Sequence, residues 1–99
     1  MNIVSKSKLK KYWLKYAGSE AALVRWYFFV KKAKWQEWKD IRDDFPSADK
    51  VGDRIIFNLK GNNYRLIVII RFFNKHIYLR WFGTYADYDK LSKEDIKNL

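Results

Sequence analysis

The sequence predicts an α+β domain in which N-terminal helices pack on a small, mainly antiparallel sheet of three to four strands. Two observations support this prediction. Apolar residues recur at helical intervals up to about residue 45, whereas β-branched and aromatic residues dominate from residue 54 to residue 82. The chain has 99 residues, of which 48% are hydrophobic, so we expect residues 1–99 to form a single domain with one core.

Three helices are expected in the first half of the chain. Apolar residues spaced three and four positions apart mark the first two, as in Leu9, Tyr12, Trp13 and Tyr16, and again in Leu23, Trp26, Tyr27 and Val30. Gly18 separates these two helices, and Ser19 and Glu20 are suited to the start of the second. A third helix is expected from Trp35 towards Phe45, where Pro46 prevents it from continuing.

The second half of the chain predicts three antiparallel strands at residues 54–59, 64–73 and 76–82, joined by two turns of hairpin type at 60–63 and 74–75. The middle strand is apolar at successive positions from Leu66 to Ile70, so we expect it to be central and covered on both faces. Residues 1–4 are candidates for a short edge strand. Residues 91–99 carry helix-start signals, Ser92 and Glu94, but are short and charged, and we expect this segment to be mobile.

The charge balance indicates a polyanionic partner. There are 21 Lys and Arg against 11 Asp and Glu, which gives a net charge of +10 and places nucleic acid first among partners. The chain has no cysteine, no signal-peptide pattern and no apolar run of the roughly 20 residues that a membrane span needs. We therefore expect a cytoplasmic protein without a membrane anchor, metal site or cofactor.

Three segments resemble a known family. Residues 45–49 (Phe-Pro-Ser-Ala-Asp), 57–66 (Phe-Asn-Leu-Lys-Gly-Asn-Asn-Tyr-Arg-Leu) and 83–89 (Gly-Thr-Tyr-Ala-Asp-Tyr-Asp) look like the HigB toxins of type II toxin–antitoxin systems. The likeness covers nearly the whole chain up to about residue 91. One departure concerns the last segment, where the family usually has His and Glu at the positions of Tyr85 and Asp87.

The resemblance implies a RelE-like fold and a ribosome-dependent mRNA interferase that cuts translated mRNA in the ribosomal A site. It also implies neutralisation by a HigA-type helix-turn-helix antitoxin, through which alone the system would contact DNA. The partners implied are thus this antitoxin, the ribosome and mRNA. Because Tyr85 replaces the family's histidine, the resemblance does not identify the group that transfers protons at this position.

The residues themselves restrict the chemistry. His76 is the only histidine, so hydrolysis by two imidazoles is excluded. Attack by a ribose 2′-hydroxyl on the adjacent phosphate needs a base, a cation for the phosphorane charge and an acid for the leaving oxygen. Arg65 is the first candidate for the cation, since a guanidinium matches two phosphate oxygens. The alternative is an arginine on a solvated strand face.

Four further residues complete the predicted catalytic set: Lys60, Arg80, Tyr85 and Tyr88. Lys60 would stabilise the same charge, or is a simple hairpin lysine. Tyr85 and Tyr88 follow the last strand in a predicted loop, where nearby cations would lower the pKa of a phenol; alternatively, one of them only packs.

Alternation places His76, Tyr78, Arg80 and Phe82 on one strand face, of which we assign a function only to Arg80. His76, next to a turn, more often faces solvent than takes part in catalysis. Seven helical lysines are expected to contact RNA or ribosomal phosphates rather than do chemistry: Lys8, Lys10, Lys11, Lys15, Lys31, Lys32 and Lys34.

Other functions are also compatible with these features. A non-catalytic RNA-binding module would share the charge and the strand aromatics, and would protect RNA without producing fragments. A protein-interaction or membrane-surface domain would use the helical aromatics and lysines. A degenerate toxin, in which the change to Tyr85 has abolished catalysis, would retain only antitoxin binding.

Overall fold

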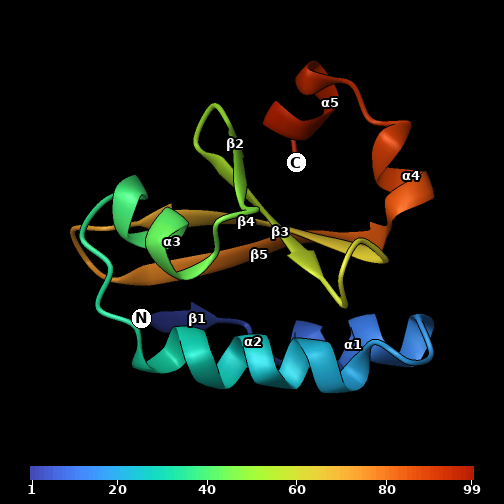
Figure 1. Ribbon diagram of the computed structural model, residues 1–99, viewed down its shortest axis with the longest axis horizontal. Helices are drawn as coiled ribbons and strands as arrows, with labels where there is room; N and C mark the ends of the chain where they lie inside the picture. Colours follow the sequence, from blue (N-terminus) through green and yellow to red (C-terminus); the bar gives the residue numbers. More distant parts are fainter.

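The structure, a computed structural model, describes residues 1–99 and is built on one five-stranded mixed sheet in the order β1-β5-β4-β3-β2 (Figure 1). The strands are β1 (Asn2–Val4), β2 (Asp49–Val51), β3 (Arg54–Leu59), β4 (Tyr64–Arg71) and β5 (His76–Thr84). The helices are α1 (Ser7–Lys15), α2 (Glu20–Lys32), α3 (Trp38–Asp44), α4 (Tyr85–Asp89) and α5 (Lys93–Lys97). The predicted α+β class is confirmed.

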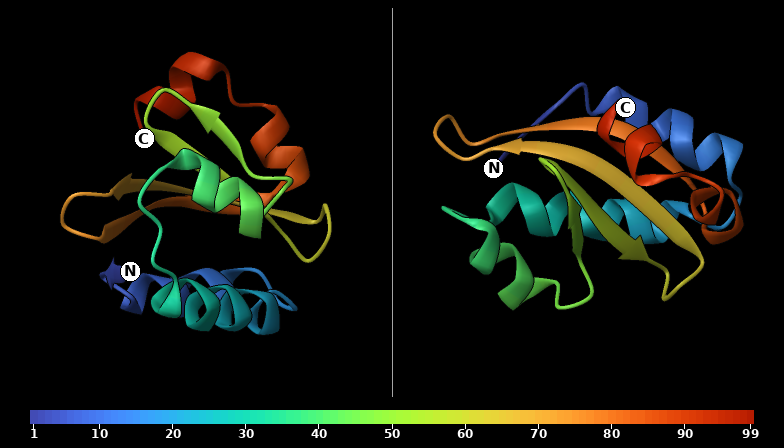
Figure 2. Two further views of the ribbon diagram at one scale, coloured as in Figure 1. Left: turned by 60° about the vertical axis from the view of Figure 1, so that its left-hand side comes forward. Right: turned by 90° about the horizontal axis from the view of Figure 1, so that it is seen from above.

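Helices cover the two faces of the sheet unequally. α1 and α2 lie side by side along one face, whereas α4 and α5 lie over one end of the other face (Figures 1 and 2). The main core is formed between the sheet and the first two helices, where Leu23, Trp26 and Val30 meet Phe57 and Val68. None of the helices has the length and apolar character needed to cross a membrane.

The third helix is shorter than its predicted range. It begins at Trp38 because Glu37 and Asp40 form a reciprocal capping box. Trp35, expected inside the helix, precedes it instead and is buried, with its Nε1 donating to the Asp44 carboxylate at 2.8 Å. The helix ends before Pro46, as predicted.

β4 is the central strand, as its apolar run predicts. Every residue from Leu66 to Ile70 is buried. Leu66 and Val68 belong to the core beneath α1 and α2, whereas Ile67 packs on the opposite face against Ile56 and Ile96. Successive residues therefore face two separate apolar layers, which explains why this strand has no polar alternation.

A β-bulge in β5 changes the side of the sheet on which the residues after it lie. The pairing of β4 with β5 shifts between Ile67 and Val68, which lie opposite Trp81 and Leu79, so Arg80 has no partner in the register. Phe82 consequently joins the core under α1, and Trp81 packs on the other face. The prediction that Phe82 shares a face with Tyr78 and Arg80 is wrong, because it assumed an uninterrupted period of two.

Two edge strands bring the sheet to five strands, so the predicted number of three to four is too low. β1 was expected, and it pairs parallel to the start of β5. β2 was not expected, since it has only three residues, Asp49–Val51, none of them buried. It pairs antiparallel with β3, and so short a strand with two charged residues has no hydrophobic pattern to reveal it.

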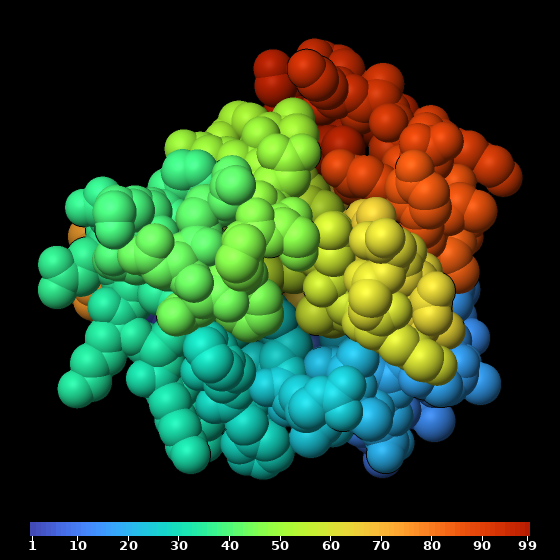
Figure 3. Space-filling view, in the orientation of Figure 1, coloured from blue at the N-terminus to red at the C-terminus, as the bar shows by residue number.

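The C-terminal segment forms a short helix that packs on the sheet, and the mobility expected for it stays a prediction. Ser92 and Asp95 form a capping box that starts α5. Ile96 is 4% exposed and contacts Ile56 and Ile67, and the segment lies against the β2–β3 region (Figure 3). Ile96, together with Leu91 and Leu99, which pack against the same cluster, thus anchors this end of the chain.

We predict that Ile96→Ala lowers the free energy of unfolding by about 2 kcal/mol, because it removes buried methyl groups and leaves a cavity over the sheet. Urea denaturation followed by circular dichroism measures the change. The matched control is Leu14→Ala on α1, whose side chain is 71% exposed and whose loss is expected to cost no more than about 0.5 kcal/mol. Equal effects of the two changes would contradict the packing of α5.

Candidate active site

Arg65 lies near the start of β4, opposite Gly83 of β5. Because its neighbour Leu66 faces the core under α1 and α2, the arginine side chain points to the other face of the sheet, where α4 lies. Arg65 is only 8% exposed, which is unusual for a cation on a strand near the end of a small sheet.

Aromatic rings and carbonyl groups surround the guanidinium. Its central carbon lies 4.7 Å from the ring centroid of Tyr85 and 5.8 Å from that of Tyr88. Its Nη1 donates to the carbonyl oxygens of Asn62 and Tyr64, both at 3.1 Å. Both rings attract the cation through their negative faces, and the carbonyls fix its plane.

The Arg65 guanidinium has no carboxylate partner, since the ion pairs of the chain all involve other residues. Nη2 and Nε make no hydrogen bond within the chain, so the donors that remain are available to a ligand. A nearly buried, unpaired cation with free donors is a receptor for an anion such as a phosphate.

The two tyrosines belong to α4 and not to a loop, which corrects the expectation from sequence. Thr84 starts this helix by accepting a hydrogen bond from the backbone N–H of Asp87 at 3.2 Å. One helical turn brings Tyr85 and Tyr88 onto the same side, three positions apart, facing Arg65. Tyr85 is 48% exposed, whereas Tyr88 is half-buried beside Trp81, with ring centroids 6.3 Å apart.

The pKa of Tyr88 is raised and not lowered, contrary to our expectation for a phenol near cations. Burial is the main cause, the Asp49 carboxylate adds to it, and Arg65 opposes both with a smaller effect. Tyr88 therefore keeps its proton at neutral pH and is suited to donate a hydrogen bond or a proton.

Sequence reasoning missed Gly83, Trp81 and Asp49. A methyl group on Gly83 would lie 2.6 Å from the Trp81 ring, so only glycine allows the indole to lie across β5 at this point. That position brings Trp81 against Tyr88. Asp49 was visible in the segment 45–49, but nothing in the sequence indicated that β2 carries it towards Tyr88.

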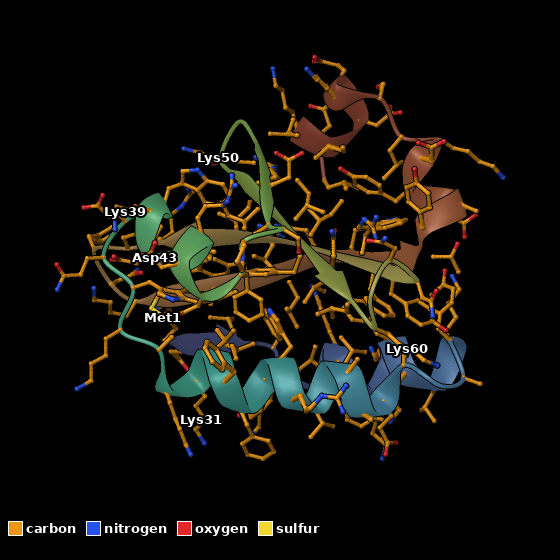
Figure 4. All side chains as sticks on the ribbon, viewed as in Figure 1. Met1, Lys31, Lys39, Asp43, Lys50 and Lys60 are labelled. Atoms are coloured by element: carbon orange, nitrogen blue, oxygen red, sulfur yellow. The ribbon has the colours of Figure 1, made fainter.

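Lys60 lies on the other side of the hairpin from Arg65. Its φ of 52° places it in the left-handed region, and its ammonium group approaches the turn between α1 and α2, where a methyl on Gly18 would be 3.2 Å from Nζ (Figure 4). Lys60 also lines a cleft with Arg25 and Phe29 of α2. It makes no contact with Arg65 or the tyrosines in this structure.

Arg80 and His76 are also separate from the Arg65 cluster. Arg80, the bulge residue, lines a cleft with Ile69 and Tyr78 further along the sheet. His76 lies by the β4–β5 turn, where its Nδ1 is 2.7 Å from the Asn74 carbonyl oxygen. No group of three or more His, Asp or Glu side chains is arranged to hold a metal ion.

The seven predicted RNA-binding lysines are all exposed and lie on or next to α1 and α2, across the sheet from Arg65. Three of them contact neighbouring groups. Lys8 donates to the Leu79 carbonyl at 3.4 Å, and Lys15 and Lys31 lie over tyrosine rings of their own helices. Lys10, Lys11, Lys32 and Lys34 make no such contact.

Comparisons with known proteins identify the family of the chain. Residues 19–91 match the HigB_toxin family, described as the RelE-like toxic component of a toxin-antitoxin system. An mRNA interferase HigB of Escherichia coli O6:H1 is 30% identical over 96 residues, covering 94% of this chain and 93% of that protein. The mRNA interferase toxin HigB of Escherichia coli (strain K12) and the mRNA interferase HigB of Shigella flexneri are each 25% identical over 92 residues, covering 90% of this chain and 88% of theirs.

Helices packed on a small mixed sheet are consistent with a RelE-like fold, and the family match places the chain in the class of RelE-like toxins. Within the class, the chain belongs to the HigB toxin family.

We predict that Gly83→Ala destabilises the fold by about 1–3 kcal/mol, because the new methyl displaces the Trp81 ring. Urea unfolding measures the cost, and the loss of Trp81 from its place beside Tyr88 should change the tryptophan fluorescence. Trp81→Leu in the same chain removes the clashing ring atoms and should recover part of the loss in a double-mutant cycle. Additive costs would mean that the two residues do not interact.

A second prediction concerns Tyr88. In a spectrophotometric titration, the phenol that disappears in Tyr88→Phe should ionise above the ordinary pKa of 10.0, because burial disfavours the phenolate. Asp49→Asn removes a negative charge and should shift this pKa downwards. A Tyr88 pKa below 10.0 in the unaltered chain would contradict the role of burial.

Proposed function

We propose that the chain is an mRNA interferase, an endoribonuclease toxin that cuts mRNA by attack of the ribose 2′-hydroxyl on the adjacent phosphate. The observation that carries the proposal is the unpaired Arg65 guanidinium between Tyr85 and Tyr88. The names of the relatives, mRNA interferases, support the same activity. Proton transfer and charge stabilisation by these side chains require no added cofactor.

Arg65 binds the scissile phosphate. Two carbonyls occupy Nη1, which leaves Nη2 and Nε to donate to the phosphate oxygens. The negative charge on these oxygens grows as the 2′-oxygen attacks, so a fixed cation with little access to water stabilises the transition state more than the bound substrate.

The tyrosines handle protons on the two sides of the phosphate. Tyr88 keeps its proton at neutral pH because burial raises its pKa, so it donates to the leaving 5′-oxygen. Tyr85 is half exposed and meets the nucleotide, either by accepting the 2′-hydroxyl proton as its phenolate or by stacking on a base. Lys60 and Arg80, distant from this cluster, act on the RNA backbone outside the reacting bond.

The ribosome presents the substrate in this proposal, and the protein acts in the cytoplasm on mRNA in the A site. The exposed lysines of α1 and α2 supply contacts to ribosomal phosphates, which position the toxin without reading sequence. A HigA-type helix-turn-helix antitoxin neutralises the toxin and carries any contact with DNA. Membership of a family of toxin–antitoxin components supports such a partner.

The test is cleavage of a defined message by the purified protein in a translating system, with mapping of the fragment ends. We expect Arg65→Ala to lower the rate by about 10²- to 10³-fold, and Arg65→Lys to recover only part of it because an ammonium lacks the planar fork. Tyr85→Phe separates the two roles of that residue: the rate falls if the hydroxyl takes the proton, and persists if the ring stacks.

Arg42→Ala is the matched control, since it removes the same charge from an exposed position on α3. Full activity of Arg65→Ala would refute the site. Protection of the message without fragments by the unaltered chain would identify an RNA-binding module instead. Absence of both cleavage and growth arrest, with antitoxin binding intact, would identify a degenerate toxin.

A further inference from the structure

A second concave surface lies on the same face of the sheet as Arg65, at the other end of β4. The cleft has a volume of about 310 Å³ and is lined by Ile69, Arg71, Phe73, Asn74, Tyr78 and Arg80. α4 and α5 cover only the opposite end of this face, and the β4–β5 hairpin extends beyond them (Figure 2, right). Neither helix contributes to the lining of the cleft.

Two aromatic side chains flank this cleft, one of them almost bare. Phe73 in the hairpin turn is 88% exposed, the largest exposure among the chain's large hydrophobic residues, and Tyr78 is partly exposed on β5. A phenylalanine ring that packs on nothing in its own chain is a platform for a flat ligand, and an unpaired base is such a ligand.

Cations and an amide line the same cleft. Arg80 is exposed, and no carboxylate pairs with it. Arg71 is held in position by Asp53, with Nη1 to Oδ2 at 3.1 Å. Asn74 Oδ1 accepts from the His76 backbone N–H at 3.2 Å, which leaves the amide N–H groups of Asn74 to face a ligand. Guanidinium groups and an amide next to an exposed phenylalanine ring and a partly exposed tyrosine are the chemistry of a single-stranded nucleic-acid site.

The cleft lies along β4 from the cluster formed by Arg65, Tyr85 and Tyr88. Arg65 and Arg71 are six residues apart on β4, so their side chains share a face and are separated by about 20 Å at 3.3 Å per residue. An RNA strand whose bases stack at intervals of about 3.4 Å covers this distance in about six nucleotides. One RNA segment can therefore reach both places.

We propose that the cleft between the β4–β5 hairpin and Arg80 is an RNA-binding subsite, in which Phe73 stacks on a base and Arg80 pairs with a phosphate several nucleotides from the scissile bond. The inference rests on the proposed function, because the distance is counted from the bond that the toxin would cut. Binding to the subsite itself can be measured without cleavage. Arg80 is in this view a binding residue, and its predicted place in the catalytic set is replaced.

The experiment measures binding of a fluorescein-labelled, fully 2′-O-methylated RNA octamer by anisotropy. The methyl groups remove the attacking hydroxyl, so the probe stays intact. We expect Phe73→Ala and Arg80→Ala each to weaken binding about tenfold. Arg80→Ala should also reduce the slope of log affinity against log salt by about 0.7, the value for one phosphate contact on a single strand.

Two control variants match these changes elsewhere on the surface: Phe28→Ala on α2, where the ring is 54% exposed, and Arg42→Ala on α3. Both should bind the octamer as the unaltered chain does, and all four variants should keep the same thermal midpoint. An equal loss in test and control variants would show that only total charge and apolar surface matter, and would overturn the subsite.

Unaltered octamer binding by the Phe73 and Arg80 variants would also overturn it. If those variants lose the antitoxin instead, the cleft is a protein-binding surface. Cleavage by Arg65→Ala, measured in parallel, keeps the two proposals apart. If Arg65→Ala abolishes cleavage and the Phe73 and Arg80 variants bind the octamer normally, only the subsite is refuted. If Arg65→Ala still cleaves the message, the proposed function is refuted.

Discussion

The guanidinium of Arg65, held between two tyrosine rings without a carboxylate partner, is the interaction on which the candidate site depends. Burying a cation has a desolvation cost that is usually offset by a buried anion. Here the faces of Tyr85 and Tyr88 and the carbonyls of Asn62 and Tyr64 offset it in part. The remaining demand for negative charge is left for a ligand, which in the proposed function is the scissile phosphate.

Two local irregularities of β5 make this arrangement fit the sheet. The bulge at Arg80 exchanges the faces of the residues after it, which places Phe82 under α1 and moves Trp81 to the side of Arg65. Gly83, two residues later, leaves space for the Trp81 ring, which in turn flanks Tyr88. Without the bulge, Trp81 would point into the helix-covered core, and Tyr88 would lose its neighbour.

Most of the fold was predictable from the sequence because it follows from periodicity. The first two helices and the central position of β4 rest on regular spacing or on an uninterrupted apolar run, whereas the edge strand β1 was only a candidate. The bulge, the three-residue β2 and the five-residue α4 were not predictable, since none is long enough to show a period. Arg65, Tyr85 and Tyr88 were predicted to lie together and do so, whereas Lys60 and Arg80 were assigned to the cluster from charge alone.

Lys60 shows why charge alone was insufficient. Successive positions in a hairpin point to different sides, and the left-handed backbone at Lys60 aims its side chain towards the turn before α2, while the carbonyl of Asn62 holds Arg65 on the far side. The cluster of Arg65, Tyr85 and Tyr88 therefore contains one cation and two phenols, and no imidazole. Burial raises the pKa of Tyr88, which makes its phenol a weaker acid, so the acid–base assistance that it gives in the proposed function is modest.

A site of this composition must gain much of its rate from geometry, by holding the 2′-oxygen in line with the phosphate. At the Arg65 site the ring of Tyr85 is half exposed, so the chain encloses this site only in part. An external body that presents the RNA already bent would supply the missing constraint, because it pays the ordering entropy before Arg65 engages. In the proposed function the ribosome is this external body, and it supplies the geometry that a site with one cation and no imidazole lacks.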